Sequence, residues 1–191
     1  MSAPVRTRRK NTFNLFKEAE KLASFDEFPM LRPEVDPQVH ASRNTVDQPF
    51  HLSCAKDTVI AQASGEARVE FPDGPVRYFD LVPGDFVYVP AGSAHRIRTL
   101  KEGVQIRYKA RSPGLERVAF RCDACGAQLD AFDIDPEGAP VQQGYDFAVR
   151  RFNAETGRRQ CRACGVEHDL IDLAPFRWAA IAEKLATPDD D

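Results

Sequence analysis

The spacing of hydrophobic residues along the chain changes twice. Residues 12–25 carry apolar side chains at helical spacing with charged residues opposite them, which predicts an amphipathic helix. Between about residues 45 and 110, short alternating segments are separated by strong turn signals such as Pro72-Asp73-Gly74-Pro75. Helical spacing returns at residues 174–186. This order predicts a mostly β fold, an antiparallel sandwich or small barrel with flanking helices.

The predicted strands are short and evenly spaced. They cover residues 58–65, 67–71, 76–81, 86–90 and 104–109, and the proline-containing segment 28–33 is expected to be extended. We expect a solvated basic tail at 1–11, a β barrel with its N-terminal helix at 12–115, a cysteine-containing region at 116–172, and a helix with an acidic tail at 173–191.

Composition narrows the class of protein. The chain has 191 residues, of which 42% are hydrophobic, so it can bury a core; its net charge of −3 argues against a nucleic-acid partner. No apolar run approaches the roughly 20 residues that span a bilayer, and the N-terminus lacks the apolar segment of a secretory signal. We therefore expect a cytoplasmic protein with no membrane partner.

Four of the five cysteines form two matched pairs. Cys122 and Cys125 are followed by a glycine, and so are Cys161 and Cys164, with 35 residues between the pairs. This spacing predicts a closed four-thiolate site for structural zinc or a rubredoxin-type iron. Two disulfides or a redox pair are the alternatives. His168 is a further candidate ligand or a packing histidine.

A second motif ends at a histidine. Gly84, Pro90, Gly92 and His95 have the spacing of the second conserved motif of the cupin superfamily, which this segment resembles; Thr99 replaces the usual asparagine at its end. The resemblance implies a cupin barrel in which His95 points inward.

The first cupin motif is only partly present. Counted back from Gly65, its first histidine is His51, whereas its second histidine is Ser53 and its glutamate is Thr58. Asp57 precedes the glutamate position and would reach the interior only through a bulge or register shift.

A cupin barrel followed by two CxxC pairs resembles bacterial 3-hydroxyanthranilate 3,4-dioxygenase. The resemblance implies a catalytic Fe(II) held by His51, His95 and a carboxylate such as Asp57, with structural zinc or iron on the four cysteines. It also implies cleavage of 3-hydroxyanthranilate or a related small aromatic acid with O2. Cys54 is a further candidate thiolate inside the barrel.

The family holds its substrate carboxylate with arginines. Arg43 and Arg98 are the candidates here, because Thr99 occupies the family's usual arginine position and Tyr108 replaces a supporting glutamate. Several basic residues crowd the strands around His95, and either some point inward or all form an exposed face. They are Arg96, Arg98, Arg107, Lys109 and Arg111.

These observations leave two main functions open. One is a ring-cleaving dioxygenase. The other is a non-catalytic cupin that binds a small aromatic acid or a partner protein, because the glutamate ligand is lost. A nucleic-acid regulator is a weaker third. Cupins often pair through edge strands, so we expect a homodimer.

Overall fold

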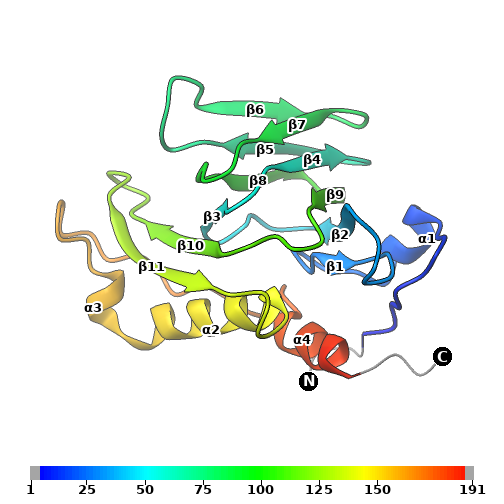
Figure 1. Cartoon of the computed structure of the whole chain (residues 1–191). Helices are drawn as coiled ribbons and strands as arrows, with labels where there is room; N and C mark the ends of the chain where they lie inside the picture. The colour runs from blue at the N-terminus through cyan, green and yellow to red at the C-terminus, as the bar shows by residue number, and fades with distance from the viewer. Residues whose placement is uncertain (1–4, 188–191) are drawn as a thin grey trace.

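The computed structural model describes residues 5–187, and its elements confirm a mostly β fold with flanking helices (Figure 1). In chain order they are α1 (Leu15–Ala19), β1 (Phe28–Pro29), β2 (Gln38–Asn44), β3 (His51–Cys54), β4 (Thr58–Gln62), β5 (Glu66–Glu70), β6 (Tyr78–Leu81), β7 (Phe86–Val89), β8 (Arg96–Lys101), β9 (Gly103–Lys109), β10 (Glu116–Arg121), β11 (Gln128–Ile134), α2 (Val141–Ala154), α3 (Thr156–Arg159) and α4 (Trp178–Ala186). Within residues 5–187, the helices are too short or too polar to cross a bilayer.

The strands form two facing layers. One is a five-stranded sheet in the order β1-β2-β9-β4-β7, in which neighbouring strands are antiparallel. The other contains the sheets β11-β10-β3 and β6-β5-β8. Leu52 on β3 and His95 just before β8 join these two sheets, because each N–H donates to the other's carbonyl, at 2.8 and 3.0 Å.

The core lies between the layers and continues beneath β10 and β11. Leu52, Ile60, Val69 and Ile97 are almost completely buried between the strands. Helix α2 covers the other end of this core, where Phe152 stacks on Phe120 of β10 with ring centroids 4.0 Å apart. Figure 1 shows α2 running along β10 and β11 with α4 beside it.

The short segment between α1 and β1 is held from both sides. Phe25 N–H donates to Asn44 Oδ1 at 2.9 Å, and Glu27 N–H donates to Ser42 Oγ at 2.8 Å. From the C-terminal side, Trp178 Nε1 donates to the carbonyl of Phe25 at 2.7 Å. Phe25 and Glu27 have φ angles of 49° and 41°, a left-handed conformation that costs free energy and persists only when neighbouring contacts fix it.

Several boundaries differ from the sequence-based prediction. The helix expected over 12–25 covers only Leu15–Ala19, because the chain after it continues in tighter turns in which Lys21 N–H and Leu22 N–H donate to the carbonyls three residues earlier. The helix expected over 174–186 begins at Trp178. The 14-residue helix α2 was not predicted.

The predicted domain limits also differ from the observed packing. Residues 1–4 and 188–191 lie outside the described residues, but the rest of the expected basic tail packs on the fold. Thr7 is fully buried, and Lys10 N–H donates to the Met30 carbonyl at 2.9 Å. At the expected boundary after residue 115, β10 pairs directly with β3, so the barrel layer continues into the cysteine-containing region.

Candidate functional site

The four paired cysteines come together as one cluster. Cys122 Sγ lies 3.6 Å from Cys164 Sγ, Cys125 Sγ lies 3.6 Å from Cys161 Sγ, and all four sulfurs lie within 4.8 Å of one another. The cysteines are not joined as disulfides. A tetrahedral ion with metal–sulfur bonds of about 2.3 Å places its sulfurs about 3.8 Å apart, so this set fits zinc or iron. The predicted four-thiolate site is therefore confirmed as a metal-binding arrangement.

Two matching backbone turns build the cluster. After the first pair, Gly126 N–H donates to the Cys122 carbonyl, and after the second, Gly165 N–H donates to the Cys161 carbonyl, at 2.8 and 2.9 Å. Both glycines have positive φ, 74° and 78°, which a side chain would disfavour. A hydrogen bond from the backbone N–H of Cys164 lowers the pKa of the Cys161 thiol to about 6, while the neighbouring thiols raise the pKa of Cys164, so the sulfurs share their protons as one set.

His168 is not part of this cluster. Its ring packs edge-on against Phe152 with centroids 5.3 Å apart, and its Nδ1 lies 2.7 Å from the carbonyl of Asp169. This placement agrees with a packing role.

The structure does not bring His51 and His95 together. His95 pairs directly with Leu52, so these two side chains share the core face, and His51, one residue earlier on β3, points to the opposite face. His95 is fully buried, whereas His51 is partly exposed near Arg96 and Arg121, which together with burial lower the pKa of His51 to about 4. One metal ion cannot bind imidazoles on opposite faces of a strand.

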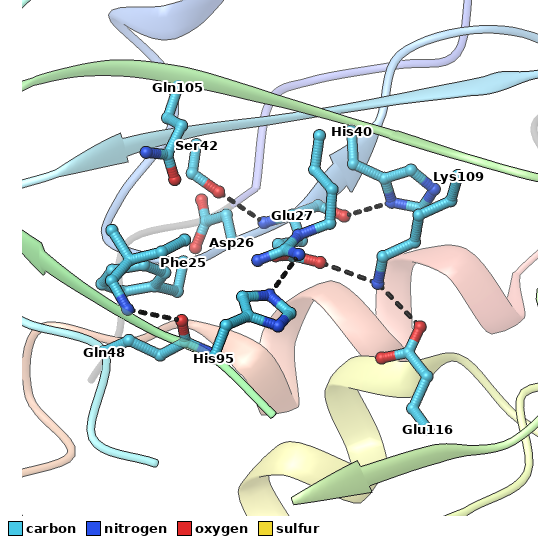
Figure 2. A network of polar contacts seen from close by, with 12 residues as sticks. Phe25, Asp26, Glu27, His40, Ser42, Gln48, His95, Gln105, Lys109 and Glu116 are labelled. Carbon is cyan, nitrogen blue, oxygen red and sulfur yellow. Dashed lines mark hydrogen bonds and ion pairs between the residues drawn. The ribbon is translucent and has the colours of Figure 1, made fainter. Parts of the chain in front are cut away.

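Both ring nitrogens of His95 already have hydrogen-bond partners, and one of these two contacts is drawn as a dashed line at His95 in Figure 2. Nδ1–H donates to the Ser93 carbonyl at 3.1 Å, and Nε2 accepts from Arg107 Nη1 at 2.7 Å. Burial and the Arg107 charge lower the pKa of His95 to about 3, so the ring is neutral near pH 7. The one free lone pair of the neutral His95 ring, on Nε2, points at the Arg107 guanidinium. His95 is therefore not available to bind a metal ion.

Arg107 belongs to a buried ion network rather than to an exposed basic face. Its Nε donates to Glu27 Oε1 at 2.7 Å, and Lys109 Nζ lies 2.9 Å from Glu27 Oε2 and 2.7 Å from Glu116 Oε1. Tyr145 donates its hydroxyl proton to Glu116. Although burial raises the pKa of Glu27, Arg107 and Lys109 hold it well below its ordinary value. The network thus balances two cations with two carboxylates.

The other residues proposed for the barrel site lie elsewhere or lack metal-binding chemistry. Asp57 is exposed and accepts a hydrogen bond from Ala91 N–H at 2.8 Å, so the strand does not bulge to bring it inside. Thr58 is buried at the family's glutamate position, but a hydroxyl cannot replace a carboxylate ligand. Cys54 is buried, and burial raises the pKa of its thiol to about 11, so it remains protonated.

Arg43 and Arg98 also face away from the interior. Arg43 pairs with Glu102 at 2.7 Å and Arg98 with Asp47 at 2.6 Å, and both arginine side chains are 44% exposed. Between Arg96 and Arg98, the side chain of Ile97 points into the core. The structure therefore does not place the side chains of Arg43 and Arg98 inside the barrel.

Sequence reasoning missed the residues that fill the interior. Glu27, Glu116 and Tyr145 were not singled out, and Arg107 and Lys109 were considered only as members of a basic cluster. The signal lies in β2 and β9, where every second residue is polar and faces the interior, whereas the positions between them are mixed and include both buried Ala41 and exposed Arg43. These inward residues are Gln38, His40, Ser42, Asn44, Gln105, Arg107 and Lys109.

A pocket of about 340 Å³ opens at one end of this network. Lys109 and Glu116 form part of its wall, together with His40 and Gln38 of β2 and the beginning of α2. His95 does not line this pocket, which provides room for a small molecule.

Comparisons with known proteins show a partial likeness to cupin structures. A scan against family models and a search of curated proteins find no match. Among solved structures, hydroquinone 1,2-dioxygenase PnpCD with Cd2+ and 4-hydroxybenzonitrile is 22% identical, covering 56% of this chain and 85% of that chain with a TM-score of 0.44.

Two further neighbours are named as cupins. A cupin-2 domain protein from Shewanella frigidimarina is 15% identical over 52% of this chain and 94% of that chain, with a TM-score of 0.45. A cupin superfamily protein from Desulfitobacterium hafniense is 18% identical over 56% of this chain and 98% of that chain, with a TM-score of 0.41. Likeness at this level assigns no activity to the present chain.

Proposed function

We propose that this chain is a metal-stabilised, non-catalytic cupin-type protein that binds a small aromatic acid. The observation that carries the proposal is the state of His95, whose two ring nitrogens are bonded to Ser93 and Arg107. A barrel that held catalytic iron would need this imidazole free, a second imidazole on the same face and a carboxylate beside them. The interior instead contains a balanced ion network.

The pocket beside Lys109 supports the binding part of the proposal. Its volume of about 340 Å³ lies within the range of small-molecule sites, and about half of the residues in its wall are polar or charged. A protein that keeps this pocket but lacks interior metal ligands can bind an acid without activating O2.

The ring-cleaving dioxygenase implied by the family resemblance is the alternative, and one experiment separates the two. The purified chain is reconstituted anaerobically with Fe(II), its metal content is measured, and O2 uptake is followed with 3-hydroxyanthranilate. We expect one ion per chain, held by the four cysteines, and no uptake above a control without protein. Two ions per chain together with uptake that disappears in His95→Ala would overturn the proposal.

We also propose a cytoplasmic homodimer. Four thiols without disulfides suit a reducing compartment, which supports the cytoplasmic location.

The exposed edge strands support the dimer. Within the described residues β6 and β7 are edge strands, and Phe86 and Tyr88 on β7 are 66% and 57% exposed, which supports pairing of two chains through this side. Light scattering after size-exclusion chromatography should give twice the chain mass of 21.4 kDa, whereas a monomer mass would contradict the dimer.

A further inference from the structure

We infer that the pocket between the start of α2 and the ends of β2 and β9 binds a carboxylic acid that also carries an amino or hydroxyl group. The carboxylate lies at the α2 N-terminus beside Arg111, and the second group donates a hydrogen bond to Gln38. This inference rests on the proposed acid-binding function and specifies where the acid binds and which acids bind well. The pocket sets two requirements on the ligand, a negative charge and a hydrogen-bond donor.

The first requirement is a negative charge. Helix α2 is 14 residues long, its N-cap residue Pro140 provides no side-chain cap, and its first turn contains no acidic residue. Pro140, Val141 and Gln142 all line the pocket. The unsatisfied N–H groups at a helix start carry a partial positive charge, which favours an anion.

The charged side chains around the pocket also favour an anionic ligand. Three basic residues line it, Arg9, Lys109 and Arg111, against two acidic ones, Glu116 and Glu137. Lys109 is already neutralised by Glu27 and Glu116. Arg111 is exposed, and its backbone N–H rather than its guanidinium bonds to Asp36, so this guanidinium is available for a bidentate contact with a carboxylate.

The second requirement is a hydrogen-bond donor on the ligand. Gln38 lines the pocket and is only 5% exposed; its Nε2 donates to the Arg32 carbonyl at 2.9 Å, and its Oε1 has no partner among the described residues. A buried acceptor without a partner costs about 1–3 kcal/mol, which a ligand donor recovers on binding.

His40 adds a second acceptor on the same wall. Its Nδ1 donates to the Glu27 carbonyl at 3.0 Å, which leaves the lone pair on Nε2. Burial and the neighbouring Lys109 lower the pKa of His40 to about 4, so the ring stays neutral near pH 7. Gln38 Oε1 and His40 Nε2 thus place two hydrogen-bond acceptors next to the anion site. They favour a ligand that has both a carboxylate and a hydrogen-bond donor over a ligand that has a carboxylate alone.

The test is isothermal titration of the full, metal-loaded chain with three matched probes, 2-aminobenzoate, benzoate and aniline. We expect 2-aminobenzoate to bind at least about 10-fold more tightly than benzoate, because only the former satisfies Gln38, and we expect no measurable binding of aniline. Benzoate binding as tightly as 2-aminobenzoate would overturn the donor requirement without any need for a variant.

Variants then locate the site. Arg111→Ala should weaken both acids at least about 10-fold, and Gln38→Met should remove the preference for 2-aminobenzoate while benzoate still binds. The matched control is Arg117→Ala, another exposed arginine, which pairs with Asp133 and does not line the pocket. Acid binding that neither pocket variant changes would overturn this site but leave the proposed acid-binding function intact. If none of the acids binds, both proposals fail.

Discussion

Arg107 Nη1 lies 2.7 Å from His95 Nε2 in a fully enclosed part of the barrel, and the same guanidinium pairs with Glu27 through Nε. Removing the arginine would therefore leave the buried imidazole without its donor and leave Glu27 with Lys109 as its remaining cationic partner. The cost of such a loss is several kilocalories per mole, because neither group can reach water.

This relationship gives the first prediction. Arg107→Met should lower the free energy of unfolding by about 3–5 kcal/mol, measured by urea denaturation with circular dichroism. The double variant Glu27→Gln/Arg107→Met should recover part of that loss, since the carboxylate charge is removed together with its partner. A single variant as stable as the natural chain would contradict a tightly coupled network.

The second prediction concerns pH. The pKa of His95 is lowered to about 3 in the folded chain, from about 6.5 when unfolded, so the unfolded chain takes up a proton first as the pH falls. Stability should therefore fall between pH 6.5 and 4, by at most about 1.4 kcal/mol per pH unit from this residue. His40 and His51 act in the same direction.

A variant isolates the contribution of His95. His95→Gln keeps an acceptor near Arg107 but does not titrate, so its unfolding free energy should depend less steeply on pH between 6 and 5. Urea denaturation at several pH values measures the slope rather than the absolute stability. An unchanged slope would show that His95 is not held neutral by its surroundings.

The third prediction concerns the four-cysteine cluster. Cys122→Ser removes one of four ligands, so bound metal should drop well below one ion per chain, and the unfolding temperature should fall, because closed metal sites stabilise the fold. Cys54→Ser is the matched control for metal content, since Cys54 lies outside the cluster. Elemental analysis and differential scanning calorimetry provide the readouts. Full metal content in Cys122→Ser would contradict the assigned ligand set.

The fourth prediction concerns the contact between α2 and β11. A Cβ atom at Gly144 would lie 2.5 Å from Cγ2 of Ile134, so Gly144→Ala should destabilise the chain by about 1–3 kcal/mol although alanine favours helices. Gly157 in α3 has open space around it, so Gly157→Ala should be neutral or stabilising by up to about 1 kcal/mol. Chemical denaturation of both variants makes the comparison, and equal effects would contradict the close approach.

The sequence was informative where local chemistry determines structure. The turn signals located β4 to β7, and the two CxxC pairs with their glycines located the metal cluster, because a short loop alone determines that geometry. Helix α2 was missed although Val141, Tyr145, Ala148, Val149 and Phe152 have helical spacing. The start of α2 has no side-chain N-cap and no acidic residue in its first turn, and Gly144 lies in its interior, so the usual sequence signals of a helix are weak.

The residues that face the barrel interior could not be predicted from local sequence patterns, because long-range contacts place them there. His51 matched a metal-binding position by spacing, but the direct pairing of Leu52 with His95 determines which face His51 occupies, and that pairing joins residues 43 positions apart. Glu27 enters the interior only because long-range contacts hold Phe25 in a left-handed conformation. Neither relationship leaves a sequence motif.

The hydrogen bond from Trp178 to the carbonyl of Phe25 has a practical consequence for anyone who wants to divide this protein. A fragment that stops after residue 115 would keep most strands of the sandwich but lose Trp178, Glu116 and β10, and with them the groups that hold Glu27 and Lys109 inside. Such a fragment would expose buried charges and aromatic rings to water and tend to aggregate. The two ends of the polypeptide are best kept on one chain, or supplied together for reassembly.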